Sequence, residues 1–141
     1  MFADQYFGAD FNMFIIIALF IKDAAVSLQS SPGLMRHHNG DDVTFSWTFT
    51  DKLENILGIE ISYNIDVVVV KRLSNGHLTI DDKYKDRVTF NVLDKSIKLI
   101  LNDVSDDDVI NGVYSLEVRY VIGGKLLSIR DNKAEIYLFG K

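Results

Sequence analysis

The side chains that could carry chemistry in this sequence are few, and their spacing is poor for a reactive site. The three histidines are His37, His38 and His77, and there is no cysteine to act as a nucleophile or to complete a zinc site. If the chain is extended at His37 and His38, the two imidazoles point to opposite sides. We therefore expect a surface turn at this pair, no metal site and no bound cofactor.

The acidic run from Asp106 to Asp108 is the other candidate for ion binding. It lacks the ligand spacing and the closing glutamate of an EF-hand loop, so a solvated loop with a salt bridge is favoured over calcium. No glycine-rich phosphate loop precedes a helix, because Gly123-Gly124 stands between two apolar runs. Nothing assembles an active site. We expect no enzyme and no small-molecule substrate.

Composition and charge narrow the classes of partner. The chain has 141 residues, 48% of them hydrophobic, which suits one domain with its own core. Its formal net charge is -5, and its lysines and arginines are scattered rather than clustered. Binding to nucleic acid needs clustered positive charge, so we expect no nucleic-acid partner.

The N-terminal segment contains an apolar run from Met13 to Ile21, about as long as the core of a signal peptide and too short to span a bilayer. We expect residues 1–25 to be a signal peptide. Asp4 and Asp10 do not suit such a leader, and a true start at Met13 would remove them. The alternative is a buried first strand or helix. We expect a secreted protein or the extracellular part of a cell-surface receptor, attached to a membrane only through an anchor outside this chain.

From Val26 onward the sequence indicates β-strands. Apolar and polar residues alternate with a period of two, and turn residues interrupt the pattern about every ten positions, as in sandwiches and barrels. Gly123-Gly124 between apolar runs predicts a tight hairpin, because glycine accepts positive φ. The predicted strands are 42–49, 59–64, 67–70, 87–92, 96–101, 113–122, 125–129 and 134–139.

Three segments resemble strands of the variable-type immunoglobulin domain. Arg87 to Phe90 is similar to strand D with its leading arginine, and Ser96 to Leu101 followed by Val104 is similar to strand E. Gly112 to Leu116 (GVYSL) is similar to the Gly-x-Tyr-x-Cys of strand F. The resemblance implies an all-β fold over residues 26–141. It would be an immunoglobulin-like β-sandwich of the V-set type, with two antiparallel sheets and no inter-sheet disulfide.

The same resemblance gives Trp47 and Leu116 a structural role, since they stand at the two cysteine positions of the family. Losing such a disulfide typically costs about 2–5 kcal/mol. Burying a tryptophan removes about 200 Å² from water, a gross gain of roughly 5 kcal/mol. We expect Trp47 packed against Leu116 to offset the missing crosslink.

Two further structural roles follow from the resemblance. Tyr114 matches the tyrosine corner, whose hydroxyl bonds back to nearby backbone. In the family an aspartate before strand F pairs with the arginine of strand D. Asp108, or alternatively Asp107, is therefore the expected partner of Arg87.

Within the family, two groups of cysteine-poor domains are similar to this chain. The closer resemblance is to the first domain of the Alr-type allorecognition receptors of colonial hydroids, through the runs VTFSWTF, SIKLILNDVS and GVYSLEV. The second is to adhesion receptors of the SLAM type. Both imply cell-surface recognition, often homophilic, through the sheet of strands G, F, C and C′.

The apolar run Val67 to Val70 marks the expected binding face. An unbroken run offers apolar side chains to both sides of a sheet, so either Val67 and Val69 or Val68 and Val70 should point outward. A mixture of acidic and basic neighbours suits a self-complementary contact. The alternative is that a tail or long loop covers this strand. The predicted partner-binding residues are Glu60, Ser62, Asn64, Val68, Val70, Lys71, Glu117, Arg119 and Leu126, with Leu127 as the alternative to Leu126.

These features predict a recognition or adhesion domain whose partner is a protein, the same or an allelic domain on an opposing cell. The first alternative is a structural immunoglobulin module inside the cell, which the absence of cysteine would suit. The second is a secreted decoy that binds a heterologous receptor. The mature N-terminus would separate the recognition domain from the intracellular module.

Overall fold

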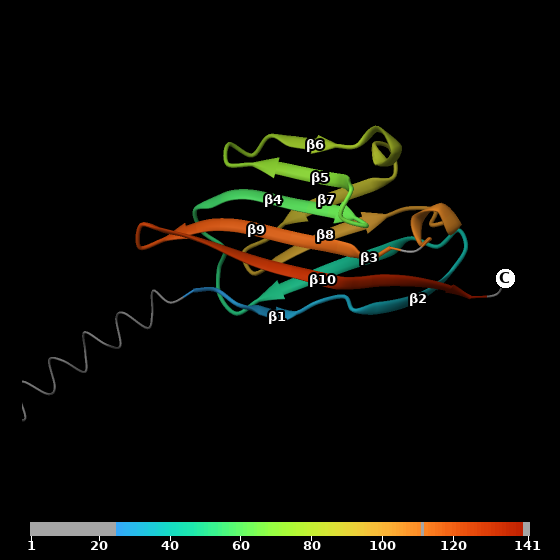
Figure 1. The fold of residues 1–141 in the computed structure, drawn as a ribbon, viewed down its shortest axis with the longest axis horizontal. Coiled ribbons are helices and arrows are strands. Elements are labelled where there is room, and N and C mark those ends of the chain that lie inside the picture. Colours follow the sequence, from blue (N-terminus) through green and yellow to red (C-terminus); the bar gives the residue numbers. More distant parts are fainter. Residues whose placement is uncertain (1–24, 111, 140–141) are drawn as a thin grey trace, which may run out of the picture.

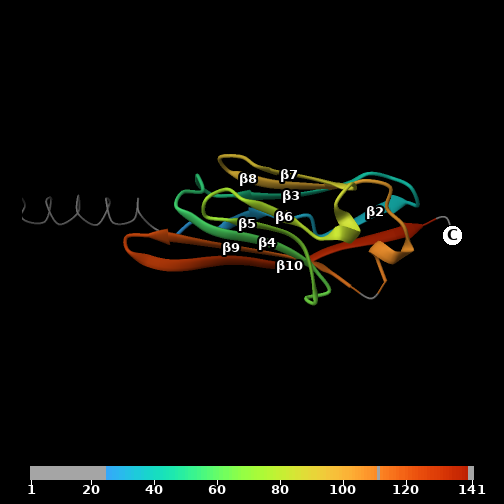
Figure 2. The ribbon, with the colours of Figure 1, turned by 90° about the horizontal axis from the view of Figure 1, so that it is seen from above.

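The fold is seen in a computed structural model that describes residues 25–110 and 112–139. The predicted signal peptide, residues 1–25, lies outside this range except for Ala25, as does the alternative start at Met13. The described part is all-β, with two sheets packed face to face in a sandwich-like arrangement (Figure 1, Figure 2).

The smaller sheet has four strands, and every pair in it is antiparallel. Their order across the sheet is β1 (Leu28–Ser30), β3 (Val43–Phe49), β8 (Ser96–Leu101) and β7 (Val88–Val92). In β3 the buried and more exposed residues alternate, as the sequence pattern predicts, so one side of the sheet faces the core.

The larger sheet has six strands. Their order is β2 (Leu34–His38), β10 (Lys125–Phe139), β9 (Tyr114–Ile122), β4 (Ile56–Tyr63), β5 (Val67–Leu73) and β6 (Leu78–Ile80). β2 pairs with β10 in parallel, so the prediction of two antiparallel sheets is corrected at this edge. Two short 3-10 turns complete the described fold, η1 (Asp82–Tyr84) and η2 (Asp106–Asp108).

The parallel pair arises because the first extended segment changes sheets between β1 and β2. Pro32, which has no backbone N–H to give to a ladder, and Gly33, with φ of 60°, stand at the change. The carbonyl of Gly33 then accepts a hydrogen bond of 2.9 Å from the N–H of Glu135. His37 and His38 therefore lie in β2 beside β10, and the prediction of a turn there is wrong.

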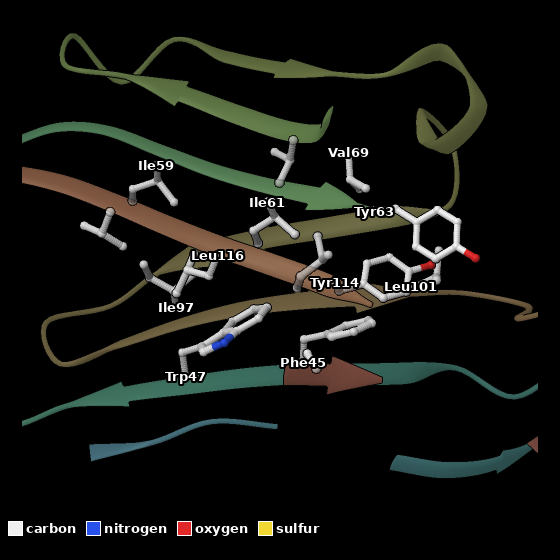
Figure 3. Packing of buried hydrophobic residues seen from close by; sticks show 14 of the residues in the cluster. Phe45, Trp47, Ile59, Ile61, Tyr63, Val69, Ile97, Leu101, Tyr114 and Leu116 are labelled. Atoms are coloured by element: carbon white, nitrogen blue, oxygen red, sulfur yellow. The ribbon is translucent and has the colours of Figure 1, made fainter. Parts of the chain in front are cut away.

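The core lies between the two sheets, and Trp47 and Leu116 belong to it with exposed fractions of 0% and 1%. Figure 3 shows them coming from β3 and β9, one strand of each sheet. Trp47 also has a polar partner that the sequence analysis missed. Its Nε1–H donates a 2.9 Å hydrogen bond to Oδ2 of Asp131 on β10, whose exposed fraction is 7%. The two sheets are thus linked by packing and one buried hydrogen bond.

The end of the sandwich near η2 is held by Arg87, Asp108 and Tyr114. Arg87 donates to both carboxylate oxygens of the buried Asp108, at 3.1 and 2.6 Å, so its partner is Asp108 rather than Asp107. The Tyr114 hydroxyl donates to the Asp108 carbonyl at 2.8 Å. The hydrogen bonds to Asp108 raise the pKa of Arg87 above its ordinary value. This network fixes β7, η2 and β9 relative to one another.

Candidate protein-binding face

The outer face of the six-stranded sheet, the side turned away from the core, collects most of the predicted binding residues. Alternation along each strand sends every second side chain outward. Glu60 and Ser62 point outward from β4, and Glu117 and Arg119 from β9, because their strand neighbours are buried. Lys71 on β5 points the same way, because it lies beside Glu60 in register.

A row of four charges crosses this outer face from strand to strand. In register, Lys71 lies beside Glu60, Glu60 beside Glu117, and Glu117 beside Arg130. The Glu117 carboxylate pairs with Arg130 at 2.6 Å and more loosely with Arg119 at 3.7 Å. Glu60 and Glu117 are like charges directly opposite each other, an arrangement that destabilises a sheet. The middle of the row therefore carries two adjacent acidic groups, of which Glu117 is held by Arg130.

A hollow of about 440 Å³ lies over the same strands. The Oγ of Ser115 in its lining is buried and has no hydrogen-bond partner in the described part of the chain. A buried unpaired hydroxyl costs about 1–3 kcal/mol, so it can contribute to binding when a ligand supplies a donor or acceptor. The hollow is lined by Glu60, Ser62, Ile65, Ser115, Leu116, Glu117, Arg130, Asp131 and Asn132.

The valine run on β5 contains a β-bulge, which corrects one predicted residue. Val70 lies opposite Ile61 and Val68 opposite Ser62, so Val69 is the extra residue between them. Val69 and Val70 are both fully buried, while Val68 is 38% exposed. Val70 does not point outward, and the simple alternation expected for the run is wrong. The bulge turns two successive valines into the core.

The remaining predicted residues lie at opposite ends of the sheet. Asn64 follows β4 in an exposed turn rather than ending the strand. Leu126 lies next to the β9–β10 hairpin and is 63% exposed, whereas Leu127 packs partly against the core. Leu126 pairs with Val121 near one end of β9, and the β4–β5 turn lies at the other. The structure does not bring Asn64 and Leu126 together.

Ile65, in the turn between β4 and β5, was missed by the sequence analysis. It is 79% exposed, and its φ of 69° follows a φ of 55° at Asn64. Positive φ at a β-branched residue is an outlier that costs on the order of 1–3 kcal/mol. The available signal was an apolar residue inside a polar turn (Asn64-Ile65-Asp66) between two strands.

Other kinds of site find little support in residues 25–110 and 112–139. No group of three histidines or carboxylates there could hold a metal ion. Nor does that range contain a helix long and apolar enough to cross a membrane. His37 Nδ1 lies 3.4 Å from Asp41, and the His38 N–H donates to the same carboxylate at 2.9 Å. The hydrogen bond from that backbone N–H lowers the pKa of Asp41 below its ordinary value.

Fold and surface together define an all-β, sandwich-like protein with a hollow, both signs of charge and exposed apolar side chains on the outer face of its larger sheet. A comparison with protein-family models finds no match to this chain, and no curated protein matches it.

Proposed function

We propose that this chain is a cell-surface recognition domain that binds another protein, rather than a catalyst. The observation that carries the proposal is the outer face of the six-stranded sheet. It combines the hollow lined by Glu60 and Glu117, the unpaired Ser115 hydroxyl and the exposed Ile65 and Val68. Exposed apolar groups among polar ones commonly mark protein-binding sites.

The fold we propose is the V-set immunoglobulin type. Strands β1, β3, β8 and β7 stand in the order of strands A, B, E and D of that fold. Strands β10, β9, β4, β5 and β6 stand in the order of G, F, C, C′ and C″. The presence of both C′ and C″ beside the GFC sheet supports the variable rather than the constant type.

The partner we propose is the same or an allelic domain on an opposing cell, as in the Alr-type receptors that the sequence resembles. The binding face supports a partner of its own kind because it offers Glu60 and Glu117 together with Lys71, Arg119 and Arg130. A face of mixed sign can pair with a copy of itself, whereas a strongly charged partner would prefer a face of one sign.

An extracellular location belongs to this proposal and depends on cleavage of residues 1–25. The alternative, a structural module inside the cell, is favoured by one feature, the absence of cysteine. The N-terminal sequence of the protein recovered from its own cells separates the two. A mature chain beginning near Val26 supports secretion or surface display, and an intact N-terminus supports the intracellular module.

Aggregation of protein-coated beads tests recognition between opposing surfaces. Beads carrying the protein should cluster, and Arg119→Glu should slow clustering by about tenfold or more, because it reverses an exposed charge on the binding face. Lys98→Glu is the matched control, since it also reverses a positive charge, but on the outer side of the four-stranded sheet. Equal slowing by both variants, or none by Arg119→Glu, would contradict the proposed face.

A further inference from the structure

The β4–β5 hairpin concentrates features that the isolated chain does not use. Ile65 at its tip has the largest exposed fraction among the large apolar residues of the described chain, and Val68 beside it is 38% exposed. Ile65 keeps its strained φ of 69°, although glycine would adopt it without cost. A residue that is both strained and exposed costs the folded monomer free energy and returns little by burial.

The two strands of the same hairpin carry one unpaired charge of each sign on their outer side, and the turn between them contains the exposed Asp66. Lys71 on β5 and Glu60 on β4 are direct neighbours in register. Neither has an ion-pair partner within 4.0 Å among the described residues, whereas Glu117 and Arg130 in the same row are paired. The hairpin thus carries both signs of charge and no net charge, although the whole chain has a formal charge of -5.

Two-fold symmetry relates these features to a single axis. When two identical faces meet about an axis lying in the contact plane, residue X faces residue Y of the copy only if the axis bisects the line from X to Y. The line from Lys71 to Glu60 runs across the strands. An axis that pairs each with the other in the copy must therefore run along the strands, midway between β4 and β5.

That axis also passes over the turn that joins the two strands. Ile65 would then meet Ile65 of the copy on the axis, where an apolar side chain can contact itself without repulsion. Val68 would face Ser62 of the copy, since these residues are neighbours in register. The charge pair alone fixes the direction of the axis, and the turn lies on that axis because it joins the two strands.

We propose that two copies of this chain pair face to face through the β4–β5 hairpin, with reciprocal Lys71–Glu60 ion pairs and an Ile65–Ile65 contact on the axis. An axis along the strands leaves both copies pointing the same way. In Figure 1 the β4–β5 turn lies at the end of the sheet toward which β10 runs. The pair is thus a lateral one within one surface. It uses Glu60, Ile65 and Val68 of the face that we propose for the opposing cell, so the two contacts are alternatives and exclude each other.

The pair is expected to be weak in solution, because a hairpin contact is small beside the roughly 1,200–2,000 Å² of a stable interface. The choice of a second copy as occupant rests on the charges. A hairpin with one lysine and one glutamate complements itself in reversed order, whereas any other partner would have to match both signs separately.

Charge reversal and mixing test the axis by sedimentation velocity of the protein at increasing concentration. The wild type should dimerise, and Lys71→Glu and Glu60→Lys should each reduce self-association by at least about tenfold, because each places like charges opposite one another. An equimolar mixture of the two variants should recover a heterodimer. In it the new carboxylate at position 71 faces the new ammonium at position 60, and the other pair is native.

The mixture separates this proposal from the proposed function. If the wild type dimerises but the mixture does not recover, the axis is wrong. A wild type that stays monomeric at the highest concentration also overturns lateral pairing, even if its beads still cluster through an opposing copy or another protein. Lys98→Glu should leave self-association unchanged. Thermal melting of each variant controls for folding, since both substitutions lie on the outer side of the sheet.

Discussion

The η2 end of the sandwich and the β4–β5 hairpin use their polar groups in opposite ways. At η2 the buried Asp108 carboxylate accepts hydrogen bonds from Arg87 and from the Ser105 N–H, and its carbonyl accepts one from Tyr114. At the hairpin, Glu60 faces a like charge and Ile65 is exposed at a positive φ. Satisfied groups stabilise the fold, and unsatisfied groups at the surface are available to a partner.

The largest loss of folding stability is expected from a substitution at the η2 end. Arg87→Ala removes the cation from a carboxylate that is fully buried, and an uncompensated buried charge typically costs about 3–5 kcal/mol. Urea unfolding followed by circular dichroism measures the loss. Arg119→Ala, which also removes an arginine but from an exposed pair, should cost less than about 1 kcal/mol. Similar losses of stability in the two variants would contradict the proposed difference between the two regions.

A somewhat smaller effect is expected where Trp47 joins the sheets. Trp47→Phe keeps a ring in the core but removes the indole N–H that donates to the buried Asp131 carboxylate, so we expect a loss of about 2–3 kcal/mol in the free energy of unfolding. Asp131→Asn keeps an oxygen acceptor for the indole and should lose less. Chemical denaturation gives the free energy of unfolding of both variants. A larger loss of stability in Asp131→Asn would argue against the hydrogen bond as the stabilising contact.

Alkaline pH should destabilise the fold through the buried tyrosines near η2. Burial raises the pKa of Tyr84 to about 12 and raises that of Tyr114 as well, from an ordinary value of 10.0. Above pH 10 the unfolded chain loses these protons more readily than the folded one, so stability should fall as pH rises from 10 toward 12. The loss is on the order of 1 kcal/mol per pH unit for each such tyrosine. Melting temperatures measured across this range should fall less steeply in Tyr84→Phe.

The smallest change in stability is expected at Ile65, and its sign is the informative part. Ile65→Gly relieves the positive φ and should stabilise the monomer by roughly 1 kcal/mol, while weakening self-association. Thermal melting and sedimentation velocity measure the two effects. Leu93→Gly is the control, because Leu93 is also exposed, at 51%, but lies in the turn between β7 and β8. A less stable Ile65→Gly protein would show that the turn is not strained.

Local patterns in the sequence were sufficient to predict the central strands, whereas the Arg87–Asp108 pair followed from the family resemblance, which left Asp107 as an alternative. Period-two alternation defines β3, β8 and β9 directly. The edge strands β1, β2 and β6 were not predicted, since three to five residues give too few alternations. The parallel pairing of β2 also depends on a partner about a hundred residues away.

The candidate site was predictable only in part. Outward residues on β4 and β9 follow from alternation, but an unbroken valine run has no period, so the bulge that buries Val70 was invisible. Arg130 was missed because the predicted strand stopped at residue 129, whereas β10 continues to Phe139. Ile65 and the hollow depend on the conformation of a turn and on neighbours from three strands. Such three-dimensional neighbours are not encoded in any local pattern.

Trp47 also provides an intrinsic fluorescence signal for the state of the fold. It is the sole tryptophan of the chain, it is fully buried, and its indole donates to Asp131 across the two sheets. Its fluorescence therefore reads out whether the sheets are still joined, and red-shifted emission would signal that water has reached the indole. Docking on the outer face should leave that emission unchanged. One spectrum, recorded without any label, can thus distinguish a variant that has lost its partner from one that has lost its fold.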